Sequence, residues 1–117
     1  MTQADFRRTV KEYGDFVESV EVFRYEEEES ISQLKARLRL FDGTMLCIRE
    51  VRIKGVLESY SYYWLRPDET AITGWDNAPH HREINSFPHH RHVGSHIEFS
   101  EERNLRDVLE FIREFMG

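Results

Sequence analysis

Hydrophobic and polar residues alternate most regularly in residues 34–40, where apolar side chains occupy every second position. A period of two places the apolar side chains on one face of a β-strand and the intervening polar ones on the other. The polar face carries Lys35, Arg37 and Arg39. Asp42-Gly43 follows as a hairpin turn signal, and apolar residues resume over residues 45–53. The pattern therefore predicts an antiparallel hairpin with one buried face.

Helical spacing appears at both ends of the chain. Thr2 and Asp5 have the spacing of a capping box, and apolar residues follow at helical intervals up to Gly14. Asn104 and Asp107 are spaced to cap a second helix. The apolar stripe of that helix consists of Leu105, Val108, Leu109, Ile112 and Phe115.

Three more segments, residues 16–25, 57–65 and 71–75, have the β-branched and aromatic composition of strands. A long loop follows, which a short strand at residues 96–99 can close. The sequence thus predicts an α+β fold, an antiparallel sheet of about five strands with an N-terminal and a C-terminal helix packed on it. At 117 residues we expect a single domain, 1–117.

Composition narrows the class of protein. Hydrophobic residues make up 39% and aromatic residues 13%, which is typical of a globular protein. The charged N-terminal segment and the lack of an apolar run of about 18 residues predict a cytoplasmic protein without a signal peptide or contact with a membrane. The single Cys47 excludes an internal disulfide. A net charge of −6 argues against a general nucleic-acid coat, although residues 35–54 are locally basic.

All six histidines lie between residues 80 and 96, directly after the turn-forming residues 76–79. Histidine titrates near neutral pH and is a common metal ligand, so this segment is the predicted functional site. Adjacent side chains of an extended chain point apart, so His90 and His92 can share a site whereas His90 and His89 cannot. The candidate acid–base residues are His81, His89, His90 and His92.

Other polar residues around this segment are candidate ligands. Arg91 is expected to bind phosphate, while Asp76 and Asn77 either form an Asx-type turn or shape a substrate-binding loop. A divalent metal bound by the histidines is an alternative, although no zinc-family spacing such as CxxC or HExxH is present.

The role of Glu50 depends on the hairpin register. A three-residue loop at residues 42–44 pairs Leu40 with Leu46 and turns Glu50 inward, where its carboxylate becomes a candidate base. A two-residue loop reverses the parity and leaves Glu50 exposed opposite Lys35. Both alternatives stay open at this point.

Three further side chains are candidate substrate ligands. Tyr62 belongs to an aromatic face that either packs in the core or stacks on bases. Arg37 and Arg39 either point into solvent or contact phosphate.

The runs WDNAPHH (residues 75–81) and FPHHRHV (residues 87–93) resemble the TumE family of small toxins from prokaryotic toxin–antitoxin pairs. The resemblance covers roughly residues 30 to 112. It implies a cytoplasmic toxin encoded beside a DNA-binding antitoxin. The family often has an arginine where this chain has Gly74. If that arginine binds phosphate, Arg82, Arg91 or the row from Lys35 to Arg39 must replace it.

Cleaving RNA without a metal requires a base for the 2′-hydroxyl, an acid for the leaving oxygen and a cation for the phosphorane. Histidine, glutamate and arginine can supply these groups. The leading hypothesis is therefore a TumE-like toxin that acts as an endoribonuclease. The alternatives are a divalent-metal- or ligand-binding module and a non-catalytic domain that docks the antitoxin. An oligomer is compatible with the sequence.

Overall fold

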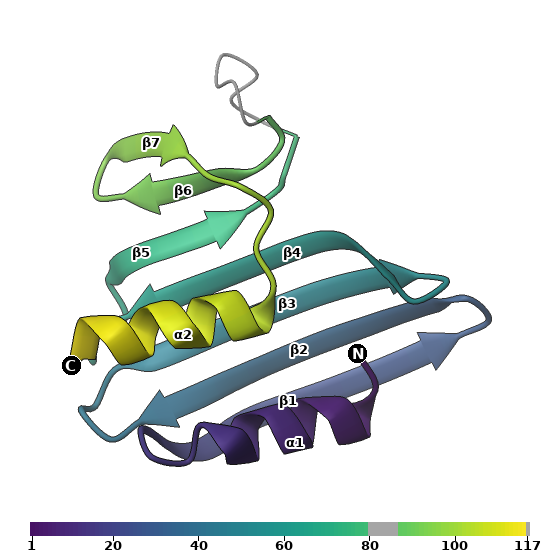
Figure 1. Ribbon diagram of the computed structural model, residues 1–117, viewed down its shortest axis with the longest axis horizontal. Coiled ribbons are helices and arrows are strands. Elements are labelled where there is room, and N and C mark those ends of the chain that lie inside the picture. Colours follow the sequence, from purple (N-terminus) through teal and green to yellow (C-terminus); the bar gives the residue numbers. More distant parts are fainter. Residues whose placement is uncertain (80–86, 117) are drawn as a thin grey trace.

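The computed structural model describes residues 1–79 and 87–116. In these residues a seven-stranded antiparallel sheet follows the order of the chain, and both helices lie on one face of it (Figure 1). The strands are Val17–Glu28 (β1), Ile31–Leu40 (β2), Met45–Ile53 (β3), Val56–Leu65 (β4), Ala71–Asp76 (β5), His90–Val93 (β6) and His96–Phe99 (β7). The helices are Gln3–Glu12 (α1) and Leu105–Met116 (α2).

The predicted α+β class is confirmed, but the prediction of about five strands is wrong. The histidine segment adds β6, which pairs with β5, and β7, which matches the short strand expected at residues 96–99. Residues 90–93 were expected to be loop because they are largely polar. Their strand conformation comes from pairing with the edge of β5 rather than from local hydrophobic alternation.

Both predicted helix caps are present. The Thr2 hydroxyl accepts a hydrogen bond from the Asp5 amide at 3.1 Å, and the Asp5 carboxylate accepts one from the Thr2 amide at 3.0 Å. Asn104 and Asp107 exchange the same two bonds at the start of α2, at 2.9 and 3.0 Å. The caps set where each helix begins and so which side chains meet the sheet.

The core lies between the sheet and the two helices. Leu38, Leu40 and Leu46 are fully buried there, together with the apolar stripe of α2 except Phe115. Burying each such leucine stabilises the fold by about 1.5–3 kcal/mol. The loop of the hairpin is Phe41–Gly43, since the Leu40 amide bonds to the Thr44 carbonyl at 2.9 Å.

This register settles the parity of Glu50. Leu46 pairs with Leu38 rather than with the expected Leu40, and this shift of two residues keeps the parity of the three-residue loop. Glu50 is therefore turned inward and is 3% exposed. The neighbouring Tyr62 is 0% exposed in the same core, which favours packing in the core over stacking on bases.

The opposite face of the sheet carries neither helix (Figure 1). We call it the open face. The register places on it one side chain from each of β1 to β6: Arg24, Lys35, Arg49, Ser61, Asp76 and His90. In the part of the chain that the structure describes, no helix is long and apolar enough to cross a membrane.

Candidate functional site

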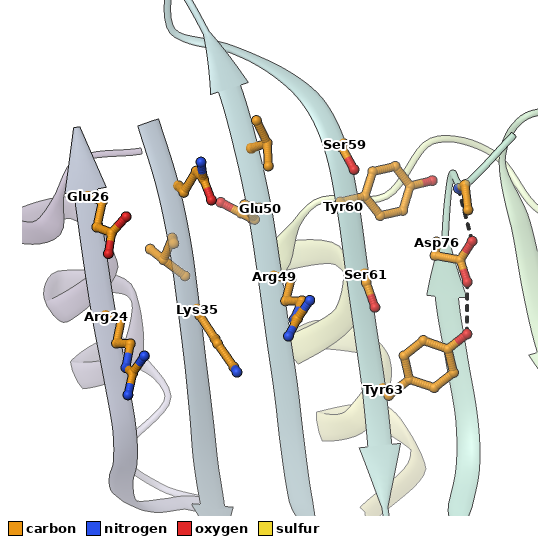
Figure 2. Close-up of a pocket in the computed structure, with 14 residues that line it drawn as sticks. Arg24, Glu26, Lys35, Arg49, Glu50, Ser59, Tyr60, Ser61, Tyr63 and Asp76 are labelled. Carbon is orange, nitrogen blue, oxygen red and sulfur yellow. Dashed lines mark hydrogen bonds between the residues drawn. The ribbon is translucent and has the colours of Figure 1, made fainter. Parts of the chain in front are cut away.

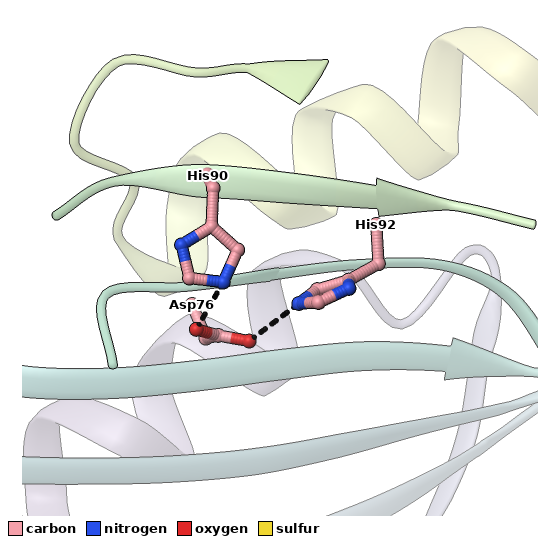
Figure 3. A group of neighbouring side chains, drawn as sticks. All are labelled: Asp76, His90 and His92. Carbon is pink, nitrogen blue, oxygen red and sulfur yellow. Dashed lines mark hydrogen bonds and ion pairs between the residues drawn. The ribbon is translucent and has the colours of Figure 1, made fainter. Parts of the chain in front are cut away.

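Asp76, the last residue of β5, lies at the centre of a polar cluster (Figure 3). Its Oδ1 is 2.7 Å from Nε2 of His90, and its Oδ2 is 3.0 Å from Nε2 of His92. Oδ2 also accepts a hydrogen bond from the Tyr63 hydroxyl at 2.8 Å, and Oδ1 accepts one from the Ala78 amide at 3.0 Å. We call Asp76, His90, His92 and Tyr63 the Asp76 cluster.

Strand register explains why these residues meet. Asp76 pairs with His90 across β5 and β6, and Gly74 pairs with His92. Side chains two residues apart on a strand share a face, so His90 and His92 reach the same carboxylate. The structure thus brings together the two histidines that alternation allows to converge, and adds Asp76 as their common partner.

Both ring nitrogens of His90 face oxygen atoms. Its Nδ1 lies 2.9 Å from the Pro88 carbonyl oxygen, which can only accept. Its Nε2 faces a carboxylate oxygen of Asp76 at 2.7 Å, which accepts when ionised. These two contacts fix the orientation of the His90 ring.

Exposure separates the two histidines. The side chain of His90 is 2% exposed and that of His92 is 27% exposed. The imidazole of His92 is therefore partly accessible to solvent, whereas that of His90 is buried against Asp76.

Tyr63 reaches Asp76 across Gly74. A Cβ atom at position 74 would lie 2.2 Å from Cδ1 of the Tyr63 ring, so only glycine fits beneath this ring. Burial raises the pKa of the Tyr63 hydroxyl, which therefore stays protonated and donates to Asp76 near neutral pH. Gly74 is needed for this arrangement. An arginine at position 74 and Tyr63 in its present place exclude each other.

The cluster also has the donor set of a metal site. One ligand atom each from Asp76, His90 and His92 lies within 4.8 Å of the others. Two imidazoles and a carboxylate suit Zn²⁺ and related divalent ions. The bond from His90 Nδ1 to a backbone carbonyl is the kind that orients a metal-binding histidine.

Arg91 lies on the other face of β6, as its place between His90 and His92 requires. Its Nε donates to the Thr73 hydroxyl at 2.9 Å, and its guanidinium packs 5.3 Å from the Trp75 ring centre and 4.8 Å from that of Phe111. The structure therefore does not bring Arg91 to the Asp76 cluster as a phosphate ligand.

His89 also lies outside the cluster. Its ring stacks on Tyr60 with 5.9 Å between ring centres, and its Nδ1 is 2.9 Å from the Tyr60 hydroxyl. Burial raises the pKa of Tyr60 to about 12, so this hydroxyl keeps its hydrogen. His81, the remaining acid–base candidate, lies outside the described residues.

The turn residues are structural in part. The Asn77 side chain accepts from the Tyr60 amide at 2.9 Å and donates to the Glu58 carbonyl at 3.0 Å, so it extends the pairing with β4. The bond from the Ala78 amide to Asp76 is an Asx-type turn. Asp76 therefore both shapes the turn and holds the histidines.

Arg37 and Arg39 are engaged in ion pairs. Arg37 lies 2.7 Å from Glu69, and Arg39 lies 2.9 Å from Glu21. Their charges are partly offset, which leaves them poorer phosphate ligands than the sequence pattern suggested.

Glu50 is buried in the core rather than in the Asp76 cluster. It accepts from the Tyr62 hydroxyl at 2.6 Å and lies 3.3 Å from Arg52. Desolvation raises the pKa of Tyr62, so that hydroxyl remains a donor. The geometry favours a structural role for Glu50 over that of a base.

Replacing Glu50 therefore distinguishes the two roles. Glu50→Ala leaves Tyr62 and Arg52 without their shared partner and is expected to lower the free energy of unfolding by about 3–5 kcal/mol. Glu50→Gln keeps an acceptor for Tyr62, so a smaller loss of stability is expected, and the growth inhibition that the family resemblance implies should be unchanged. Urea denaturation and a growth assay measure both. A folded, non-toxic Glu50→Gln variant would instead make Glu50 a catalytic base.

Sequence reasoning missed Tyr63 as a site residue. The available signal was a glycine at position 74 within a strand, which marks a close approach by another group. Beside Tyr63 and Asp76, the open face forms a hollow of about 580 Å³ (Figure 2). Basic side chains from β1, β2 and β3 also line it.

Comparison with models of known protein families found a match over nearly the whole chain. A family model described as Toxin TumE matches residues 6–116. The chain belongs to the TumE toxin family. Residues 6–116 span the whole sheet and α2, so the TumE match includes the Asp76 cluster. TumE membership makes the chain a toxin of a toxin–antitoxin system. Comparison with curated proteins and with solved structures found no match.

Proposed function

We propose that this TumE-family toxin cleaves RNA in the cytoplasm by acid–base catalysis at the Asp76 cluster. The observation that carries the proposal is the placement of His92, partly exposed on the open face, 3.0 Å from a buried carboxylate. A carboxylate that accepts from one imidazole nitrogen fixes the ring's orientation and stabilises its protonated form. Asp76 and His92 have this relationship.

The reaction follows from these groups. His92 takes the proton of a ribose 2′-hydroxyl, and the 2′-oxygen attacks the adjacent phosphorus. A 2′,3′-cyclic phosphate forms as the bond to the 5′-oxygen breaks, and that oxygen leaves with a proton from an acid. His90 and Tyr63 position Asp76, while His81, predicted from the sequence, is our candidate for the acid.

The partner of the toxin, on this proposal, is an antitoxin encoded by a neighbouring gene. A toxin that damages RNA must be neutralised in the cell that makes it. The open face carries the Asp76 cluster, so an antitoxin that covers this face would block access to His92.

A divalent-metal-binding module is the second candidate, and the grouping of Asp76, His90 and His92 favours it. In that case the purified protein holds one ion per chain through three ligands. Stoichiometric binding of Zn²⁺ by a folded protein that leaves RNA intact would support this candidate over acid–base catalysis.

Induced expression in a bacterial host tests the proposed function. We expect growth to slow and total RNA to fragment within the same period, and co-expression of the neighbouring gene to relieve both effects. The matched control is His92→Ala at equal protein yield, which should leave growth and RNA intact. Normal growth of cells that contain abundant folded wild-type protein would contradict the proposal.

A further inference from the structure

Three basic side chains lie directly opposite one another on the open face (Figure 2). The register pairs Arg24 of β1 with Lys35 of β2, and Lys35 with Arg49 of β3. We call these three residues the cationic row. The cationic row does not include Arg37 or Arg39, which the sequence pattern suggested as phosphate ligands. Lys35 is the one residue that the row shares with the basic alternation of β2.

The cationic row costs stability. Neighbouring strands are about 4.8 Å apart, and like charges directly opposite each other destabilise a sheet. Arg37 and Arg39 are offset by glutamates, but within residues 1–79 and 87–116 no ion pair or side-chain hydrogen bond offsets the cationic row. Glu26 lines the same hollow without pairing with it. Uncompensated repulsion of this kind favours the binding of an anion.

The row leads into the Asp76 cluster. Along the same line across the strands, Arg49 pairs with Ser61, Ser61 with Asp76, and Asp76 with His90. Arg49 and Asp76 are thus two strands apart, about 10 Å at the usual strand spacing. The hollow of about 580 Å³ connects them and has the size of a small-ligand site rather than of a duplex groove.

We propose that the cationic row binds the phosphates of single-stranded RNA that runs across the strands toward the Asp76 cluster, an inference that rests on the proposed function. Phosphates would offset the three charges and would account for the repulsion. The direction of the row would place a neighbouring phosphodiester beside His92. The cationic row would contact the phosphate backbone of the RNA rather than its bases. Binding should therefore depend strongly on salt and weakly on the RNA sequence.

Binding of a labelled single-stranded RNA tests this in a His92→Ala background, in which the RNA stays intact. Lys35→Gln/Arg49→Gln is expected to weaken binding at least ten-fold at low salt. It should also reduce the slope of log affinity against log salt by about 1.4, since each phosphate contact on a single strand contributes about 0.7. Thermal stability should stay equal or rise, because two like charges are removed. The control Arg8→Gln/Lys11→Gln removes the same charge from exposed positions of α1.

Equal losses in the two double variants, or none in either, would overturn the inference. Normal RNA binding combined with lost neutralisation by the antitoxin would also overturn it, and would make the row a protein-binding surface. If the wild type cleaves RNA and the Lys35→Gln/Arg49→Gln variant binds RNA normally, the cationic row is not an RNA-binding site, but the proposed function stands. If the cationic row binds RNA but the wild type does not cleave it, the proposed function is wrong, but the row remains an RNA-binding site.

Discussion

His92→Ala is expected to reduce the rate of RNA cleavage by about 10²–10⁴-fold, the usual cost of removing a catalytic acid or base. The side chain is partly exposed and belongs to β6, the strand next to the edge strand β7, so the free energy of unfolding should change little. Cleavage of a labelled RNA by purified protein measures the rate, and urea denaturation measures stability. His96→Ala is the matched control, since His96 is exposed and outside the Asp76 cluster.

Variants of Asp76 and His90 distinguish an effect on catalysis from an effect on stability. Asp76→Asn keeps the shape of the side chain but presents an amide to the His92 ring, so activity should fall in a protein that still folds. His90→Ala removes a buried ring and its bonds to Asp76 and Pro88, so stability should fall as well. Full activity in folded His92→Ala would place the reaction elsewhere on the molecule.

Gly74→Ala is expected to destabilise the protein by about 1–3 kcal/mol or more, because the added methyl group overpacks against Tyr63. The ring cannot move aside cheaply, since its hydroxyl is held by Asp76 at 2.8 Å. Displacing the ring also disturbs the carboxylate that orients His92, so RNA cleavage should fall in the folded fraction. Urea denaturation and the cleavage assay measure the two effects.

A double-mutant cycle isolates the contact. Tyr63→Ala opens the space above position 74, so Gly74→Ala should then cost little additional stability. Independent, additive losses would show that the ring does not set the requirement for glycine. For the same reason Gly74→Arg should lower activity, and a gain in toxicity would contradict the geometry described above.

Local signals predicted the parts of the fold that depend on local chemistry. The alternation in β2 and the paired caps at Thr2 and Asn104 act over a few residues, and the structure has them where expected. The strand β6 could not be predicted in this way, because its pairing with β5 is a tertiary contact.

The candidate site was predicted in part for the same reason. A period of two placed His90 and His92 together, but Asp76 was interpreted as a residue of a turn or of a substrate-binding loop and not as their shared partner. Tyr63 and Gly74 meet only through the register of β4 and β5. The pairing of Arg24 with Lys35 depends on two irregularities in β1 that shift its register. The sequence does not show where such irregularities occur.

Product analysis of RNA cleaved by the purified toxin tests the central claim most directly. The reaction is run in excess EDTA on a single-stranded RNA, and the new termini are identified. Acid–base catalysis at the Asp76 cluster predicts 2′,3′-cyclic phosphate and 5′-hydroxyl ends, no cleavage beside a 2′-deoxyribose, and no products from His92→Ala. Intact RNA, or cleavage that needs a metal ion and leaves other termini, would contradict the account.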